Sequence, residues 1–337
     1  MSADILYSIR DLTVEYNTRA GPVRAVDDVS LDIQRGEILG LVGESGCGKS
    51  TLGKALIRLH EGMASITAGE LWFDGRDLMK LPLREMPDIR GAEIGMVFQD
   101  PMTSLNPVQR ILDHLTETIH THEPEISDAS ARARAEELVE RLGIRRERLK
   151  EYPHQMSGGM RQRVMISLAL ALRAKLVIAD EPTTSLDVIV EAKFLDLLRE
   201  LQKEFGLTIL LITHNIGVVA EVADRVAVMY AAKMAEIGTA REVFADPKHP
   251  YTQGLLKSVP NIELDGGDLY KMSGEPPDLL HPPAGCCFHP RCPFVMDICS
   301  QEEPVFEPVT GDHLAACWLY RKAGAATASV KKEARNG

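Results

Sequence analysis

The chain has few aromatic residues, no long apolar run and no excess of basic charge. Aromatic side chains make up 5% of its 337 residues, whereas 45% are hydrophobic, a balance that suits an α/β core with a smaller unit added. The richest apolar run, 164–172, is shorter than the roughly 18 residues that a membrane-spanning helix needs. The net charge of −11 argues against a nucleic acid partner.

Two further absences concern the compartment. The N-terminus, Met1–Asp4, lacks the basic and then apolar layout of a signal peptide, which predicts a cytoplasmic protein. Cytoplasmic thiols stay reduced, so no disulfide framework is expected. Five of the six cysteines nevertheless lie between Cys286 and Cys317, and this crowding makes metal binding the first question about them.

A glycine-rich segment that ends in a lysine and a hydroxyl is the strongest motif. It reads Gly43, Glu44, Ser45, Gly46, Cys47, Gly48, Lys49 and Ser50, followed by Thr51. Because glycine lacks a Cβ atom, such a loop can turn its N–H groups toward phosphates. The Lys49 ammonium then meets the β- and γ-phosphates, and Ser50 is left to bind Mg²⁺. An apolar strand pattern at 38–42 and helical spacing at 50–57 flank the loop, and together they predict a nucleoside triphosphate site.

The first third of the chain reads as strands. Residues 5–42 alternate apolar and polar side chains around a turn at Ala20–Pro22, which predicts an antiparallel hairpin. The segment 69–75 continues this pattern and ends in Asp-Gly, a turn signal. Residues 94–98 then form one more apolar run that fits a buried strand.

The middle of the chain changes to helices and buried strands. Residues 108–150 have helical periodicity and high charge, with an amphipathic helix expected at 131–142. Two apolar strands at 176–179 and 208–212 enclose a helix at 191–205. This βαβ unit predicts a parallel sheet.

The composition changes again past about Phe244. Prolines become frequent before the cysteine cluster, at Pro247, Pro250, Pro260, Pro276, Pro277, Pro282 and Pro283. This part is expected to be a separate, loop-rich appendage. The small and polar tail from Ala323 is expected to be disordered.

Acidic residues follow the strand at 176–179 directly. Asp180 and Glu181 stand at its carboxyl end, where ligands of parallel sheets gather. We expect Asp180 to hold Mg²⁺ through water and Glu181 to polarise the water that attacks the γ-phosphate. His214 ends the next apolar strand in the same way and is placed to contact the γ-phosphate.

A second candidate phosphate site lies at Ser157–Arg163. This segment opens a helix with a hydroxyl and two glycines. One nucleotide cannot reach both this helix and the Lys49 loop, so the segment calls for a partner chain. A stand-alone P-loop kinase would leave it unexplained.

These motifs, with Gln99 after the strand at 94–98 and Ser185-Leu186-Asp187 after Glu181, resemble the ATP-binding subunits of ABC transporters over about residues 5–320. In that family, Tyr16 would stack on adenine, residues 43–51 would hold the phosphates, and Ser50, Gln99 and Asp180 would bind Mg²⁺. Hydrolysis would depend on Glu181, His214 and Gln99. Ser157, Gly158, Gly159 and Asp187 would close over ATP bound to the opposing subunit.

The resemblance implies a P-loop NTPase (RecA-like) α/β core with an antiparallel β subdomain, an inserted helical subdomain and a cysteine-rich C-terminal extension. The nucleotide-binding domain would span 1–245, with the helical subdomain at about 105–165. The extension would span 246–322 and the disordered tail 323–337.

Finer similarity to the dipeptide and oligopeptide importer branch, in particular its D-type ATPase subunit, comes from Phe98–Pro107, His249–Thr252 and the cysteine pattern. It implies an ATP-hydrolysing motor subunit on the cytoplasmic face of the membrane. The implied partners are a non-identical F-type ATPase subunit, two permeases that dock near Gln99, and an extracytoplasmic binding protein. The cargo stays open, because this branch also imports nickel and oligosaccharides. A soluble ABC ATPase of translation or DNA repair is the alternative, but one phosphate loop and no sustained heptads disfavour it.

Two features depart from that family's usual pattern. Asn215 follows His214 where an aspartate is usual, and Met156 and Met160 replace the commoner leucine and glutamine around the glycine pair. Neither change removes a catalytic group.

The cysteine cluster leaves several metal sites possible. Cys286, Cys292, Cys299 and Cys317 are separated by five, six and seventeen residues, unlike the paired Cys-x-x-Cys of structural zinc sites. An all-cysteine [4Fe–4S] cluster tolerates such uneven spacing, and the resemblance points the same way. Zinc and merely buried thiols are the alternatives. Cys287 is expected to be a spare. His289 and His313 are alternative ligands, but each is expected to be a surface side chain.

Overall fold

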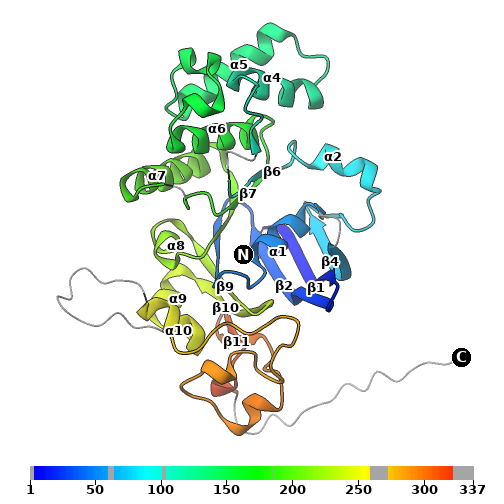
Figure 1. The fold of residues 1–337 in the computed structure, drawn as a ribbon, viewed down its shortest axis with the longest axis vertical. Coiled ribbons are helices and arrows are strands. Elements are labelled where there is room, and N and C mark those ends of the chain that lie inside the picture. The colour runs from blue at the N-terminus through cyan, green and yellow to red at the C-terminus, as the bar shows by residue number, and fades with distance from the viewer. Residues whose placement is uncertain (1–3, 60–63, 101–103, 185, 259–271, 322–337) are drawn as a thin grey trace, which may run out of the picture.

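A computed structural model describes residues 4–59, 64–100, 104–184, 186–258 and 272–321. The strands form two β-sheets (Figure 1). The larger sheet has eight strands in the order β11-β12-β10-β9-β3-β8-β7-β6, and the smaller sheet has four in the order β2-β1-β4-β5. The strands are β1 Ile5–Thr18, β2 Gly21–Gln34, β3 Ile38–Val42, β4 Ala64–Phe73, β5 Arg76–Asp77, β6 Ile94–Val97, β7 Leu176–Asp180, β8 Thr208–Thr213, β9 Arg225–Tyr230, β10 Lys233–Thr239, β11 Glu307–Thr310 and β12 His313–Ala315.

Helices cover both sheets. The α-helices are α1 Lys49–Leu56, α2 Met86–Ile89, α4 Ile111–His122, α5 Asp128–Arg141, α6 Gly158–Leu170, α7 Val188–Phe205, α8 Ile216–Val222, α9 Ala240–Ala245 and α10 Pro250–Lys257. Short 3₁₀ helices are η1 Leu83–Glu85, η2 Arg146–Lys150, η3 Pro153–Gln155, η4 His289–Arg291, η5 Asp297–Ser300 and η6 Trp318–Tyr320. Within the described ranges, no helix is both long and apolar enough to cross a bilayer.

The parallel part of the larger sheet confirms the predicted βαβ unit. β7 pairs with β8 in parallel, β8 with β3, and β3 with β9. Every residue of β3, β7 and β8 is buried, which is why these strands read as unbroken apolar runs. Helix α7 starts at Val188, three residues before the predicted start, because the Asp187 side chain caps it by accepting from the Val190 N–H.

Helix α1 lies between the two sheets. Its Leu52 and Leu56 belong to one core with Leu12 of the small sheet and Leu41 of the large one. The Tyr7 hydroxyl also donates to the Leu56 carbonyl at 2.7 Å. Packing on both sides fixes the direction of α1, and therefore of the loop that precedes it.

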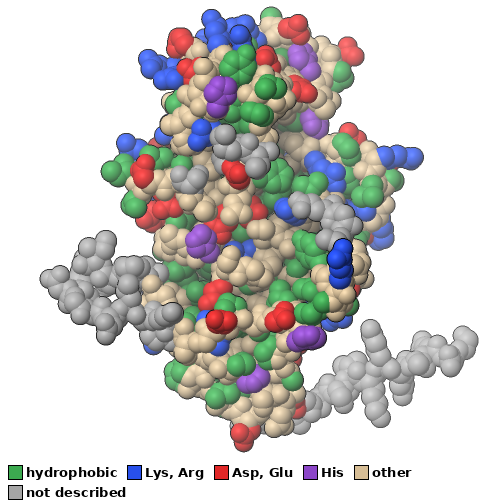
Figure 2. Space-filling model, in the orientation of Figure 1, with side chains coloured by type: hydrophobic (Ala, Val, Ile, Leu, Met, Phe, Trp, Pro, Cys, Tyr) green, Lys and Arg blue, Asp and Glu red, His purple; other side chains and the backbone are tan. Residues whose placement is uncertain are grey.

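The inserted helices form one end of the molecule (Figure 1). Their apolar faces, with Leu115 and Ile119 on α4 and Ala135 and Val139 on α5, share a core with α6 and α7. Basic and acidic side chains are interspersed at this end in Figure 2.

The predicted C-terminal extension is loop-rich over 272–306, but it joins the larger sheet instead of standing apart from it. β12 pairs antiparallel with β10, with Glu236 opposite Ala315, and β11 pairs with β12. The fully buried Glu236 carboxylate lies 2.7 Å from His313 Nε2, and it accepts from the Lys248 and His249 N–H groups. The extension therefore widens the main sheet and is anchored by a buried polar contact. The predicted disordered tail, 323–337, lies outside the described residues.

A charge network at the end of β4 leads to a pH prediction. Asp74 accepts from Lys175 at 2.6 Å and from Arg35 at 2.8 Å, and these hydrogen bonds, first that of Lys175, lower its pKa to about 2. A depressed carboxyl pKa adds stability that is lost as the pH falls toward the folded value. We therefore expect Asp74→Asn to cost less than about 1 kcal/mol at neutral pH, and to flatten the fall in melting temperature between about pH 4 and pH 2. Thermal unfolding of both proteins across this range checks it, and parallel pH profiles would contradict it.

Candidate nucleotide site

The loop between β3 and α1 needs glycine at defined positions. Gly48, the N-cap of α1, has φ +107°, and a Cβ atom there would lie 1.9 Å from the Ala25 carbonyl oxygen. A Cβ atom on Gly43 would lie 2.1 Å from the Met229 carbonyl oxygen. The loop thus passes against two backbone segments, which only glycine permits.

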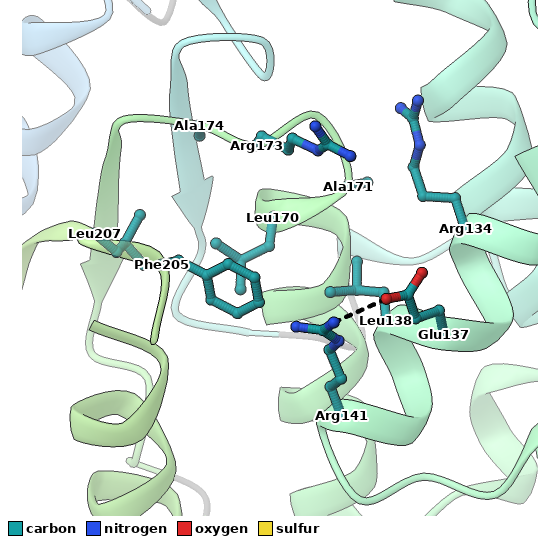
Figure 3. A pocket seen from close by; sticks show the side chains of 10 residues that line it. All are labelled: Arg134, Glu137, Leu138, Arg141, Leu170, Ala171, Arg173, Ala174, Phe205 and Leu207. Carbon is teal, nitrogen blue, oxygen red and sulfur yellow. Dashed lines mark hydrogen bonds and ion pairs between the residues drawn. The ribbon is translucent and has the colours of Figure 1, made fainter. Parts of the chain in front are cut away.

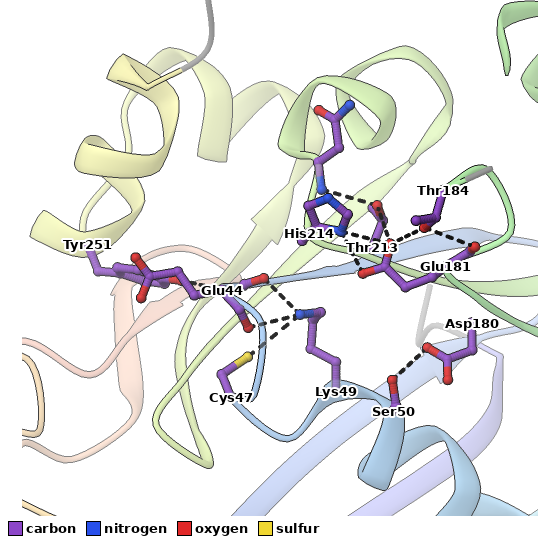
Figure 4. Close-up of polar contacts among 12 residues, drawn as sticks. Glu44, Cys47, Lys49, Ser50, Asp180, Glu181, Thr184, Thr213, His214 and Tyr251 are labelled. Atoms are coloured by element: carbon purple, nitrogen blue, oxygen red, sulfur yellow. Dashed lines mark hydrogen bonds and ion pairs between the residues drawn. The ribbon is translucent and has the colours of Figure 1, made fainter. Parts of the chain in front are cut away.

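Lys49 lies within this loop (Figure 4). Its ammonium donates to the Gly43 carbonyl at 2.8 Å and to the Glu44 carbonyl at 3.0 Å, and it is 3.9 Å from Cys47 Sγ. The side chain is buried. A positive charge is therefore held where the loop and the N-terminus of α1 meet, as an anion site requires.

Ser50 and Asp180 meet across the site. The Ser50 hydroxyl donates to Asp180 Oδ1 at 2.8 Å. Burial raises the pKa of Asp180, although the Ser50 hydrogen bond opposes the shift. A hydroxyl and a carboxylate side by side are oxygen ligands of the kind that Mg²⁺ prefers.

Glu181 and His214 form the next pair along the sheet edge. Both Glu181 carboxylate oxygens lie 2.9 Å from His214 Nδ1, and Thr184 Oγ1 donates to Oε2 at 3.1 Å. The Glu181 side chain is buried, and its backbone has φ +49°, a left-handed conformation unusual for glutamate. Such strain costs on the order of 1 kcal/mol and is found preferentially at functional sites. In Figure 4, the Glu181 and His214 side chains lie near those of Lys49 and Asp180.

Two further predicted residues border this group. The hydroxyls of Tyr16 and Thr51 lie 3.3 Å apart, so β1 touches the first turn of α1. Gln99 is exposed two residues after β6, the neighbour of β7. Residues 101–103 of the predicted permease-docking segment lie outside the described residues.

The second predicted phosphate segment begins α6. Ser157 is the N-cap and accepts from the Met160 N–H at 3.4 Å. A Cβ atom on Gly159 would lie 2.7 Å from Val190 Cγ1 of α7, so the start of α6 packs against the start of α7, where Asp187 is the N-cap. Ser157 and Asp187 are both exposed. These residues form one accessible group, joined by Gly158 in the first turn of α6, and Ser185 lies outside the described residues.

The four cysteines share a cavity. Cys286, Cys292, Cys299 and Cys317 line a cavity of about 10 Å³ together with Trp318. Burial raises the pKa of Cys286 to about 12 and of Cys317 to about 11, so these thiols are protonated at neutral pH. Four thiols are a suitable donor set for iron–sulfur or zinc, but no three potential ligands in the described ranges are arranged to hold an ion. The predicted metal site is therefore not confirmed.

Of the other predicted members of the cysteine region, His289 lines the same cavity as the four cysteines. Cys287 lines separate hollows beside Lys233. His289 Nδ1 lies 3.0 Å from the Cys286 carbonyl oxygen. His313 is buried against Glu236, so the prediction of a surface side chain there is wrong.

The sequence analysis did not identify four residues that contact Glu181 or Glu44. Thr184 and Thr213 donate to Glu181, at 3.1 and 3.4 Å. Two residues of the C-terminal part, Tyr251 and Arg291, contact Glu44. The arginine stands beside Cys292 in the sequence, but nothing local indicates that it reaches a loop 247 positions away.

A larger hollow lies at the other end of the strands (Figure 3). Its volume is about 370 Å³, and Arg141, Arg173 and Phe205 line it. Arg141 pairs with Glu137 at 2.9 Å and lies over the Phe205 ring. Leu207, just before β8, also lines it. The hollow is therefore at the amino end of strands whose carboxyl ends carry the site.

Comparison with known proteins identifies the family. A model described as ABC transporter matches residues 26–184, and one described as oligopeptide/dipeptide transporter, C-terminal region, matches 235–299. The dipeptide transport ATP-binding protein DppD of Bacillus subtilis is 47% identical over 93% of this chain and 94% of its own length. The oligopeptide transport ATP-binding protein OppD of Escherichia coli is 46% identical over 94% of both. The chain belongs to the ABC transporter ATP-binding proteins of the dipeptide and oligopeptide branch.

The solved structures agree with this membership. The ABC transporter cassette MJ0796, solved as a dimer, superposes with a TM-score of 0.63 at 30% identity, covering 70% of this chain and 99% of that one. The ABC protein cbiO1 of Clostridium perfringens gives 0.62 at 30% identity, over 72% of this chain and 92% of its own. The predicted ABC ATPase fold is thus confirmed.

The structure also shows the role of Asn215, which stands where an aspartate is usual in the ABC family. Asn215 is the N-cap of α8, and its side chain accepts from the Gly217 N–H at 3.0 Å. An aspartate caps in the same way, so the change keeps the local structure while removing one negative charge beside His214.

Proposed function

We propose that this ABC subunit hydrolyses ATP to drive import of dipeptides or oligopeptides. One observation carries the proposal: the Lys49 loop, the Ser50–Asp180 contact and the Glu181–His214 pair stand together at the carboxyl ends of β3, β7 and β8. Close relatives named as dipeptide and oligopeptide transport ATP-binding proteins support the peptide cargo.

Each residue has a defined task in this proposal. The N–H groups of residues 43–51, except that of Glu44, and the Lys49 ammonium bind the phosphates, and the Tyr16 ring stacks on adenine. Ser50, Asp180 and Gln99 hold Mg²⁺, which when bound neutralises phosphate charge. Glu181 accepts a proton from the attacking water, and His214, 2.9 Å away, orients that carboxylate.

A second ATPase completes the site in this proposal. Ser157 and Asp187 are exposed and Gly158 and Gly159 are half-buried between them, and MJ0796 was solved as a dimer. We propose a non-identical partner ATPase, two permeases that contact the segment after Gln99, an external binding protein, and a peripheral position on the cytoplasmic face of the membrane.

Reconstituted transport tests the function. Vesicles that hold this chain, its partner ATPase and two permeases should accumulate a labelled dipeptide or oligopeptide when ATP and the binding protein are supplied. Omitting this chain should abolish uptake, because one composite ATP site would lack its loop. Uptake of nickel or an oligosaccharide instead of peptides would change the assigned substrate. Uptake that does not need ATP would show that this chain is not the motor of transport.

We propose further that Cys286, Cys292, Cys299 and Cys317 bind a [4Fe–4S] cluster, with zinc as the alternative. The four-thiol donor set that lines one cavity supports this. Ligation requires thiolates, so the raised pKa values of Cys286 and Cys317 mean that binding would release protons. The metal would tie η4, η5 and η6 together.

Colour and metal content test this site. The full chain purified without oxygen should be brown, with absorption near about 400 nm, and Cys292→Ser should bleach it because one ligand is lost. Cys287→Ser is the matched control and should stay brown, since Cys287 lines other hollows. If metal analysis finds about one zinc per chain and no iron or sulfide, the site binds zinc instead of a cluster. If it finds no metal, the proposal is wrong.

A further inference from the structure

The phosphate loop carries a negative charge of its own. Glu44 is the second residue of a loop whose N–H groups and lysine are suited to anions. Figure 4 shows its carboxylate turned away from the Lys49 ammonium. An uncompensated carboxylate at this position would repel the phosphates of ATP, since like charges repel each other at the effective dielectric of a protein surface.

Arg291 of η4 supplies the compensating charge. Its Nη1 donates to Glu44 Oε2 at 2.7 Å and its Nη2 to Oε1 at 2.9 Å, a two-bond contact of fixed geometry. The arginine side chain is 5% exposed. Its Nε donates to the Ser273 carbonyl, and its Nη1 to the Tyr230 hydroxyl. The Glu44 hydrogen bonds raise the pKa of Arg291 above its usual range, so this cation is permanent.

Tyr251 of α10 holds the backbone of the same residue. Its hydroxyl accepts from the Glu44 N–H at 2.7 Å, and its buried ring lies 4.5 Å from the ring of Tyr230 and 5.5 Å from that of Phe288, centre to centre. The Glu44 carbonyl accepts from Lys49. The N–H, the carbonyl and the carboxylate of Glu44 are therefore all engaged, two of them by the C-terminal part.

We propose that Arg291 is a positioning residue for ATP binding, which neutralises the carboxylate of the phosphate loop and keeps it turned away from the nucleotide. The C-terminal extension thereby sets the affinity of the site for ATP. This inference rests on the proposed function, because it takes the loop to be the site of ATP. It predicts effects of opposite sign at the two ends of one ion pair, which a purely structural contact would not produce.

Nucleotide titration of the full-length protein tests the inference. With a non-hydrolysable ATP analogue and Mg²⁺ in a calorimeter, Arg291→Gln should weaken binding about tenfold, because the negative charge of Glu44 is then no longer compensated. Glu44→Gln should tighten binding severalfold, since the loop loses a negative charge and Arg291 is left free. The double variant Glu44→Gln/Arg291→Gln should return to within about threefold of the wild type. Arg291→Lys, which keeps the charge, should recover part of the loss.

The results of these titrations distinguish a failure of this inference from a failure of the proposed function. If Glu44→Gln weakens binding as Arg291→Gln does, or if the double variant is no better than Arg291→Gln, the contact only holds the fold and the inference is wrong. If the wild-type protein itself does not bind the analogue, the proposed function fails. Should Arg291→Gln not fold, the sign of the Glu44→Gln effect still decides. Higher salt should shrink the difference between Arg291→Gln and the wild type, since the effect is electrostatic.

Discussion

Glu181→Gln should bind ATP and Mg²⁺ as the wild-type protein does, yet lose turnover in the assembled transporter by about a hundredfold or more. The amide keeps the shape of the side chain and can still contact His214 and Thr184. It has no basic oxygen to accept the proton of the attacking water, so only the chemical step fails. Phosphate release with saturating ATP measures turnover, and calorimetry measures binding.

Glu221→Gln is the matched control for this result. Glu221 is an exposed glutamate of α8, one element beyond the site, so its turnover should match that of the wild type. A Glu181→Gln protein that hydrolyses ATP at the normal rate would show that another group accepts the proton. A protein that no longer binds ATP would show that Glu181 supports the site instead of the chemistry.

Gly48→Ala should abolish measurable nucleotide binding. The new Cβ atom would stand 1.9 Å from the Ala25 carbonyl oxygen, and φ +107° is a conformation that L side chains rarely adopt. The neighbouring contact is backbone of β2, so the loop must move and Lys49 moves with it. We expect ATP affinity to fall by more than about a hundredfold and the free energy of unfolding by about 2–4 kcal/mol. Calorimetry and chemical denaturation measure the two effects.

Gly46→Ala separates strain from collision in the same loop. Gly46 also has positive φ, at +82°, but a Cβ atom there meets nothing within 4 Å. Its cost should be limited to backbone strain of about 1–2 kcal/mol, and ATP affinity should fall far less than in Gly48→Ala. Equal losses in the two variants would mean that the close approach to Ala25 is unimportant.

Local sequence signals predict the core of this site well. The strand at 38–42, the loop and the helix after it are contiguous, so the positions of Lys49 and Ser50 follow from neighbouring residues. Asp180 ends β7, Glu181 follows it and His214 follows β8, and adjacent parallel strands place their ends together. The 2.9 Å Glu181–His214 contact is a consequence of that register.

Contacts between distant segments could not be predicted in this way. β12 is three residues long and pairs with a strand more than seventy positions earlier, so periodicity gives no sign that the extension joins the sheet. The cysteines were recognisable as ligand types, but their spacing in the chain says nothing about how their sulfur atoms are arranged. The role of Asn215 as a helix cap is local in contrast, because the side chain bonds to a backbone N–H only two residues further on.

The contact between Glu44 and Arg291 has a consequence for the newborn chain. The arginine is synthesised 247 residues after the glutamate, which at synthesis rates of about 5–20 residues per second leaves roughly 12–50 seconds between them. During that interval the nucleotide-binding fold can form on the ribosome while its loop still carries an unshielded negative charge. If Arg291 sets the affinity for ATP as proposed, full affinity is reached only after η4 has been synthesised and has docked against the loop.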